Sequence, residues 1–438
     1  MEQLLKIGER ISLFNKRTCT VESFLGSGTQ GEVYSVKEGK NSYALKWYFK
    51  ENATRELYQS LQEIVRKGSP TNQFLWPLEV VESEKQKGRF GYLMQLRPKE
   101  YKNLSGWATM QFRMDFREQI TACLQLAESF HYLHAKGLSY QDISFANIFI
   151  DPKKGNILIC DNDNVSVNGK TVGGVMGTPR FMAPEIVTGK AKPSIATDQY
   201  SLAVMLFYIL MMSHPLEGKK EAAIKCFDVP AMNKIYGEEP VFIFDPDNDS
   251  NRPVKGIHNN AIICWDVYPT FIKDLFTKSF TKGITEPKSR IRESQWQEAF
   301  SKLLDSILYC PHCGNENFYH DTVFNQTGKL HCCLPKCKAE ITVPARIKIE
   351  KKLIMLNQNS CIYASHIDPD CGENARQVVA QVVQNPNNPG IWGIKNLTQN
   401  TWTYTNANNQ LIQIPQGKSA LIKSGAKINF GKSEGEVL

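Results

Sequence analysis

The stretch from Ser139 to Asp163, SYQDISFANIFIDPKKGNILICDND, carries polar residues at a spacing suited to metal and phosphate chemistry. Asp142 and Asn147 are five residues apart, and Asp161 follows Asn147 by fourteen, across a hairpin signalled by DPKKGN. A loop and a strand end separated in this way can place one carboxylate near a substrate hydroxyl. They can also place an amide and a second carboxylate on Mg²⁺. We therefore take Asp142, Asn147 and Asp161 as candidate site residues.

Two features upstream add phosphate-binding chemistry. LGSGTQGEV supplies Gly26, Gly28, Gly31 and Val33 as GxGxxGxV between two expected strands, where glycines let backbone amides approach phosphates without a side-chain clash. Fifteen residues after Gly31, YALK puts Lys46 on the third expected strand, within reach of nucleotide phosphates. A glycine-bearing hairpin alone would carry similar letters, so the order of loop, lysine and carboxylates is what indicates a nucleotide site.

The lysine needs a carboxylate on the following helix to hold its ammonium in place. The expected helix ATRELYQSLQEIVRKG offers Glu63 and Glu56. The spacing along the chain to the later segment FLWPLEVV favours Glu63 as this carboxylate, and Glu56 is the alternative. Either glutamate could instead be a surface charge.

Hydrophobic periodicity predicts the elements that position these residues. The segment from about 18 to 47 is short and β-rich, and the helix after it carries Leu57, Leu61 and Ile64 on one face. Farther on, FREQITACLQLAESFHYLHAKG has helical spacing, and DQYSLAVMLFYILMM is apolar all round, as a central core helix would be. A β-rich lobe with one helix is therefore expected to precede a helical lobe that ends near Leu308.

In this order and spacing, the chain resembles the eukaryotic-type Ser/Thr protein kinases of bacteria over roughly residues 18 to 308. The triplet APE at 183–185 supports the resemblance, as does Asp198, which stands where the family's central helix begins. Arg290 stands where the family has the arginine that pairs with the APE glutamate. The resemblance implies a bilobal kinase fold and transfer of the γ-phosphoryl group of ATP to Ser or Thr of a partner protein and of the chain itself.

The resemblance also implies roles for the candidate residues. Asp142 would accept or orient the hydroxyl proton, Asn147 and Asp161 would hold Mg²⁺ or Mn²⁺, and Lys46 would grip the phosphates. Because positioning and charge neutralisation carry most of the rate in this reaction, losing Asp161 should harm activity more than losing a surface residue.

Several positions depart from the family pattern. Tyr140-Gln141-Asp142 replaces HRD, so a phosphorylated activation loop, in which Thr171 and Thr178 lie, has no arginine to pair with. Ser144 stands where the family usually has a phosphate-binding lysine, and DND replaces DFG. The alternative to an active kinase is therefore a nucleotide-binding pseudokinase scaffold that recruits partners through its later modules. A small-molecule phosphotransferase is disfavoured by APE and by GTPRF at 177–181, which resemble a peptide-substrate platform.

A cysteine-rich segment follows. CPHCG gives Cys310 and Cys313, and HCCLPKC gives Cys332 or Cys333 together with Cys337. Two thiolate pairs separated by about 15–20 residues are typical of a tetrahedral zinc ribbon. We favour Cys333 over Cys332 as the third ligand. With four protein ligands, the Zn²⁺ would be structural.

The segment from 344 to 438 contains strand-like pieces between Asn, Pro and Gly turns, which predicts an all-β domain. IWGIKNLTQNTWTYTN and IPQGKSALIKSGAKINFG resemble the second half of a forkhead-associated (FHA) domain, with Thr398 and Asn400 in its ligand-facing loop. The family's phosphate-clamping arginine is missing from NSCIYASHI, and Arg376 is a candidate substitute. A β-sandwich for docking or partner binding is therefore the more cautious interpretation.

The order of kinase, zinc ribbon and FHA-like end resembles the kinase of bacterial tellurium-resistance-associated gene clusters. The stretches SYQDIS, CDNDN and FIFDPDNDSNRP prompt this narrower match. It implies a stress-response kinase acting on a neighbouring protein, with a von Willebrand-type protein and a PP2C-type phosphatase as expected partners.

Bulk composition fits an α+β protein of several domains. We expect a kinase domain at 1–308 with lobes at about 18–98 and 99–308, a zinc ribbon at 309–342 and a β domain at 343–438. The 438 residues carry 52 basic and 44 acidic side chains, a mild excess that gives no reason to expect nucleic-acid binding. The longest apolar run, Leu202–Met212, is too short to cross a membrane, which needs about 20 residues. We expect a cytoplasmic protein with mostly reduced or metal-bound cysteines.

Overall fold

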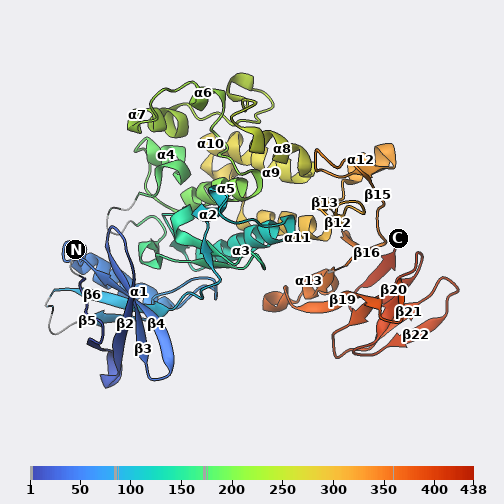
Figure 1. Ribbon diagram of the computed structural model, residues 1–438, viewed down its shortest axis with the longest axis horizontal. Coiled ribbons are helices and arrows are strands. Elements are labelled where there is room, and N and C mark those ends of the chain that lie inside the picture. The colour runs from blue at the N-terminus through green and yellow to red at the C-terminus, as the bar shows by residue number, and fades with distance from the viewer. Residues whose placement is uncertain (1–2, 83–85, 87, 171–173, 175, 359) are drawn as a thin grey trace. The chain divides into compact units, whose positions relative to one another are not determined.

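The computed structural model describes residues 3–82, 86, 88–170, 174, 176–358 and 360–438. The chain folds into two units (Figure 1). The first unit contains Met1–Asp266 and Thr270–Gln297, and the second contains Val267–Pro269 and Glu298–Leu438.

The first unit begins with a six-stranded antiparallel sheet in the order β1-β2-β3-β4-β6-β5. Its strands are β1 (Arg10–Ser12), β2 (Thr18–Ser27), β3 (Gly31–Glu38), β4 (Asn41–Tyr48), β5 (Glu79–Glu82) and β6 (Phe90–Gln95). Tyr34, Val36, Leu45 and Trp47 are buried in the core against one face of this sheet. The three strands expected before residue 48 are present. The structure adds β1, whose three residues are too few to show a period.

Helix α1 (Arg55–Lys67) is the single helix expected beside this sheet. The Thr54 side chain accepts a hydrogen bond from the Leu57 backbone N–H, which caps the first turn. Leu61 and Ile64 are buried, and the helix ends at Gly68, whose φ of 68° continues neither helix nor strand. The predicted helix and its apolar face are confirmed.

The rest of the first unit is mainly helical. Its helices are α2 (Ser105–Ala108), α3 (Phe116–Ala135), α4 (Pro184–Val187), α5 (Ile195–Met211), α6 (Lys219–Ala222), α7 (Val229–Asn233), α8 (Asn259–Val267), α9 (Thr270–Phe280) and α10 (Lys282–Thr285). Helix α11 (Glu293–Asp305) begins in the first unit and continues into the second. Helix α5 is buried at every residue from Tyr200 to Met211, which confirms the predicted central core helix. Helix α3 packs against it.

Short strands carry the segment that holds the candidate site. Strands β9 (Ile148–Ile150) and β10 (Ile157–Ile159) form the expected hairpin, with Ile150 opposite Ile157. β7 (Lys102–Asn103) adds to this sheet, and β8 (Leu138–Ser139) pairs with β11 (Ser166–Val167). The hairpin brings Asp161, just after β10, back towards the loop that carries Asp142 and Asn147.

In the second unit, two small hairpins follow the end of α11. β12 (Ile307–Tyr309) pairs with β13 (Glu316–Phe318), and β14 (Leu330–His331) pairs with β15 (Glu340–Ile341). Helix α12 (Asp321–Thr327) lies between the hairpins in sequence and was not predicted. Leu308, Leu330 and Ile341 bury their side chains with Cys310 and Cys332 in a very small core.

The C-terminal part is all-β apart from the short α13 (Ala364–Ile367) and a 3₁₀ turn, as predicted. One sheet has the order β17-β16-β25-β24-β21-β22, and the other has the order β18-β19-β20-β23. The strands are β16 (Arg346–Ile349), β17 (Lys352–Met355), β18 (Cys361–Tyr363), β19 (Val378–Asn385), β20 (Asn388–Asn396), β21 (Trp402–Thr405), β22 (Leu411–Ile414), β23 (Ser419–Leu421), β24 (Lys427–Asn429) and β25 (Glu434–Val437). Both sheets contribute to one core that includes Ala380, Ile394, Trp402 and Ile428.

Among the described residues, no helix combines the length and apolar character needed to cross a membrane.

Candidate active site and cysteine cluster

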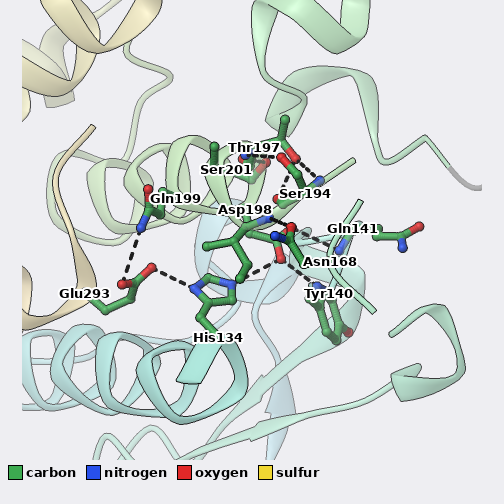
Figure 2. Close-up of polar contacts among 12 residues, drawn as sticks. His134, Tyr140, Gln141, Asn168, Ser194, Thr197, Asp198, Gln199, Ser201 and Glu293 are labelled. Atoms are coloured by element: carbon green, nitrogen blue, oxygen red, sulfur yellow. Dashed lines mark hydrogen bonds and ion pairs between the residues drawn. The ribbon is translucent and has the colours of Figure 1, made fainter. Parts of the chain in front are cut away.

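Asp198, on α5, anchors the loop that carries the candidate catalytic residues (Figure 2). Its carboxylate accepts hydrogen bonds from the backbone N–H groups of Tyr140 and Gln141, at 2.5 and 3.0 Å. The helix itself starts at a capping box formed by Ser194 and Thr197. Because Asp198 is buried on α5, the loop is tied to the central core helix of the lobe.

Asp142 is held through both oxygens of its carboxylate. The Asn147 amide nitrogen donates to Asp142 Oδ2 at 3.0 Å and to the Asp142 carbonyl at 2.9 Å. The Thr178 hydroxyl donates to Asp142 Oδ1 at 2.7 Å. Thr178 is thus part of the site rather than a free hydroxyl in the loop, whereas Thr171 lies outside the described residues.

Asp161 occupies an uncommon backbone conformation at the end of β10. Its φ of 51° and ψ of 43° are left-handed, a region that non-glycine residues adopt mainly where the surroundings demand it. Its side chain keeps 45% of its surface accessible and lies 3.5 Å from Lys46 Nζ. Desolvation raises the pKa of Asp161, and Lys46 opposes that rise. The arrangement gives an accessible carboxylate beside a cation.

Lys46 lies on β4 and is almost completely buried. Its Nζ lies 2.7 Å from Asp163 Oδ2 and 3.2 Å from the Gln30 side-chain oxygen. Burial would lower the pKa of Lys46, but Asp163 and Asp161 raise it above its ordinary value, so the ammonium stays charged. Lys46 therefore meets Asp161, another candidate site residue, and Asp163, which was not a candidate.

The glycine loop between β2 and β3 has one position that requires glycine. A Cβ on Gly31 would lie 2.2 Å from the Trp47 carbonyl oxygen, so any side chain there would push β3 away from β4. Gly26 and Gly28 have open space around them, as expected where a ligand approaches the backbone. Val33 lies opposite Lys46 across the strand pair.

The structure does not bring the predicted glutamates to Lys46. Glu56 is exposed and Glu63 is partly buried on α1, and within the described residues Lys46 forms its ion pairs with Asp161 and Asp163. Asp163 was missed because it stands two residues after Asp161, where the family has glycine. The only signal was the second aspartate of DND, and its contact with Lys46 spans 117 residues.

Gln141 stands where the family has arginine and makes uncharged contacts. Its side-chain nitrogen donates to the Ser166 hydroxyl and, at 2.9 Å, to the Lys170 carbonyl. The start of the activation loop is thus tied down by hydrogen bonds that need no phosphate.

Arg290 and Glu185 form the expected ion pair. Two guanidinium nitrogens donate to the two Glu185 oxygens, both at 2.8 Å. Arg290 also donates to the carbonyls of Gly283 and Ala196 at 2.9 and 2.8 Å. This buried pair fixes the APE segment to the helical lobe.

His134, on α3, links Asp198 to Glu293 (Figure 2). Its ring nitrogens lie 3.2 Å from Asp198 Oδ2 and 2.7 Å from Glu293 Oε1. Burial lowers the pKa of His134, but the two hydrogen-bonded carboxylates outweigh it and raise the pKa to about 9. The buried imidazolium therefore stabilises the helical lobe.

This network predicts a pH-dependent stability. Because the folded pKa is raised from 6.5 to about 9, the contribution of His134 is complete below pH 6.5 and is lost as pH rises through 9. The loss amounts to at most about 3 kcal/mol. The check is the free energy of unfolding in urea, measured for wild type and for His134→Gln at pH 6.5 and pH 9.5. We expect the stability difference between the two proteins to shrink at the higher pH, and an equal difference at both pH values would contradict the account.

Four cysteine sulfurs converge in the second unit. Those of Cys310, Cys313, Cys332 and Cys337 all lie within 4.8 Å of one another. Hydrogen bonds from the backbone N–H groups of Cys313 and then His312 lower the pKa of Cys310 to about 6, which favours the thiolate that binds metal.

The choice of Cys333 as the third ligand is corrected to Cys332. The Cys333 sulfur lies instead 3.5 Å from the Asn315 amide nitrogen and 3.7 Å from the Glu316 carbonyl. The chain bends at Cys333, whose backbone N–H donates to the Asn317 side-chain oxygen at 2.7 Å, so Cys332 faces the cluster and Cys333 does not. The Cys332 backbone N–H donates to Ala339 at 2.9 Å, which sets the orientation.

Comparison with known families agrees with this geometry. The model of the protein kinase domain matches residues 19–308. The chain belongs to the protein kinase family. Two thirds of this kinase thus lie in the matched domain, and the four-cysteine cluster and C-terminal β-sheets follow it.

Known relatives of this kinase are distant. The NUAK family SNF1-like kinase 2 of Rattus norvegicus is 26% identical over 198 residues, which cover 44% of this chain and 31% of that protein. The human form is 26% identical over 219 residues, 49% of this chain and 34% of that protein. The dual serine/threonine and tyrosine protein kinase of Gallus gallus is 32% identical over 96 residues, 22% of this chain and 10% of that protein. The matched residues therefore cover between 10% and 34% of the length of these relatives.

Proposed function

We propose that this chain transfers the γ-phosphoryl group of ATP to Ser or Thr hydroxyls of a partner protein and of itself. The observation that carries the proposal is that the site retains four chemical groups, although the motifs HRD and DFG are altered. These groups are the Lys46 ammonium, the accessible Asp161 carboxylate beside it, the Asp142 carboxylate, and the Asn147 amide that holds Asp142. The name of one relative, the dual serine/threonine and tyrosine protein kinase of Gallus gallus, includes this substrate class.

Each residue has a role in that reaction. Asp142, fixed by Thr178 and Asn147, orients the substrate hydroxyl and accepts its proton as the hydroxyl attacks phosphorus. The bond from the γ-phosphorus to the bridging oxygen breaks, and ADP leaves. The Lys46 ammonium and the glycine-loop amides hold the phosphates in line, so positioning supplies most of the rate.

The residues present fit a divalent cation. Asn147 uses its amide nitrogen on Asp142, which leaves the amide oxygen for a cation, and the accessible Asp161 carboxylate supplies a second hard oxygen ligand. Mg²⁺, or Mn²⁺, would neutralise charge on the phosphates when bound. Without it, burial disfavours the Asp161 charge, so cation binding and ionisation of Asp161 should reinforce each other.

The substrate class is tested by incubating the full chain with Mg·ATP and a generic basic acceptor, then identifying the modified residues by mass spectrometry. Phosphoserine or phosphothreonine is expected. Phosphotyrosine alone would overturn the Ser/Thr assignment. A chain that binds Mg·ATP but forms no phosphoprotein would instead be the nucleotide-binding scaffold.

Activity should not require loop phosphorylation, because Gln141 holds the loop through uncharged hydrogen bonds. Phosphatase treatment is expected to change the initial rate by less than about 2-fold, whereas Gln141→Ala should lower it about 10-fold. Initial rates of the treated kinase and the variant check this. A phosphatase effect as large as that of the variant would contradict it.

The second unit supports a role in partner binding. Four clustered thiols suit a structural Zn²⁺. The β-sheets that follow carry Asn396, whose side-chain nitrogen donates to the Asn400 carbonyl at 2.7 Å and to the Ile414 carbonyl at 2.9 Å. This orders the loop that contains Thr398 and Asn400, where an FHA-like domain would meet its ligand.

Arg376 lies over the Tyr363 ring, 4.7 Å from its centroid. We propose docking of a partner protein here rather than phosphothreonine capture by Arg376.

The resemblance to tellurium-resistance-associated kinases extends the proposal to physiology. On that basis, the partners would be a von Willebrand-type protein and a PP2C-type phosphatase, and the setting a bacterial stress response. We extend the proposal to a cytoplasmic location, where cysteines stay reduced or metal-bound.

A further inference from the structure

The pairing of Lys46 departs from the arrangement expected of the family. Its nitrogen lies 2.7 Å from Asp163 Oδ2, and the two side chains are 7% and 1% exposed. Asp161 lies farther from the same nitrogen, at 3.5 Å, and remains accessible. The two aspartates therefore differ in what they can do: Asp161 can receive a cation from solvent, whereas Asp163 is enclosed with the lysine.

Two tyrosine hydroxyls hold the Asp163 carboxylate from the sheet. Tyr48 OH donates to Oδ2 at 2.5 Å, and Tyr92 OH lies 3.4 Å from Oδ1. Both rings are fully buried. Desolvation, followed by the charge of Asp163, raises the pKa of both hydroxyls well above the ordinary value, so they remain protonated donors.

The backbone that carries Asp163 is also fixed. Asn162 is fully buried, and its amide nitrogen donates to the carbonyls of Leu75 and Ile159 at 2.9 and 3.0 Å. The asparagine that replaces the family's phenylalanine thus works as a hydrogen-bonded anchor. It holds the turn at 162–164 against the segment that precedes β5 and against the end of β10.

We propose that Asp163 is the positioning residue of Lys46, in the role expected of a glutamate on α1. Asp163, Tyr48 and Tyr92 keep the ammonium directed at the nucleotide phosphates, and the site is complete without an ion pair from α1. This inference rests on the proposed function only in taking Lys46 as a phosphate-binding group. It implies that displacement of α1, a common way to switch kinases, has little effect on nucleotide binding here.

The test measures affinity for a non-hydrolysable Mg·ATP analogue by calorimetry on the full chain. Asp163→Asn keeps the shape but removes the charge, and Glu63→Gln and Glu56→Gln are the matched controls. We expect Asp163→Asn to weaken affinity about 10-fold or more and each glutamate variant to change it less than about 2-fold. A change below about 2-fold in Asp163→Asn, or an equal loss in either control, overturns the proposal.

A double variant separates positioning from a general structural role. If Asp163 acts through Lys46, Asp163→Asn in a Lys46→Met background should cost no further affinity. An additive loss would overturn the proposal. Should Asp163→Asn fail to fold, Tyr48→Phe replaces it, and that variant must lose more affinity than both glutamate variants for the proposal to stand.

These affinities need no turnover, so the outcome is distinct from that of the proposed function. A chain that shows this pattern but transfers no phosphate would refute the proposed function and leave the role of Asp163 intact.

Discussion

Asp161→Asn is expected to lower kcat/KM for phosphoryl transfer by at least about 10³-fold. Asp161 is the accessible carboxylate next to Lys46, whereas Asp163 is enclosed by the lysine and two tyrosines and cannot take over a cation. The substitution keeps the side-chain shape and removes only the charge. Initial rates across a Mg²⁺ series measure the effect.

The same variant should fold at least as well as wild type. Because partial desolvation and the neighbouring Asp163 charge raise the pKa of Asp161 against the opposing effect of Lys46, its charge opposes folding, and a neutral side chain removes that penalty. Thermal unfolding should therefore show an unchanged or higher midpoint. Asp247→Asn, which removes an equivalent charge from an exposed loop, is the matched control and should keep full activity. Comparable activity in the two variants would contradict the role of Asp161.

Removing the metal or its third cysteine ligand is expected to unfold the cysteine-rich segment at 309–342. Its own core contains only a few apolar residues, too few to hold two short hairpins without a metal. Wild type and Cys333→Ser should each bind one Zn²⁺, whereas Cys332→Ser should bind it at least about 100-fold more weakly. Elemental analysis and competition with a chelator measure these differences.

Limited proteolysis provides an independent measure of the same change. The segment should be protected in wild type and in Cys333→Ser, and should be cut rapidly in Cys332→Ser or after chelation. Zinc loss in Cys333→Ser but not in Cys332→Ser would contradict the cluster that the structure assigns.

The features predicted from sequence are those that short-range patterns determine. The apolar run of α5, the hairpin at DPKKGN and the strand that carries Lys46 each depend on residues close together in the chain. The candidate site could be predicted from the order of its parts along the chain, because their roles in the reaction fix their relative positions. These parts are the glycine loop, Lys46, Asp142, Asn147 and Asp161.

The features that sequence could not give depend on long-range contacts or on side-chain direction. No local pattern shows that Lys46 pairs with Asp163 rather than with Glu63, because the choice depends on how β4 packs against the turn after β10. Cys332 and Cys333 differ by one position, and the pairing of the second hairpin decides which one faces the cluster. The link from His134 to Glu293 crosses 159 residues and follows only from helix packing.

The most direct test of the account is transfer of labelled γ-phosphate from Mg·ATP by the full chain, measured beside Asp142→Ala. The account predicts label in wild type, on the chain itself and on a basic acceptor, and none above background in the variant. Wild type that binds Mg·ATP yet transfers no more label than Asp142→Ala would contradict the claim that this altered site is a working kinase.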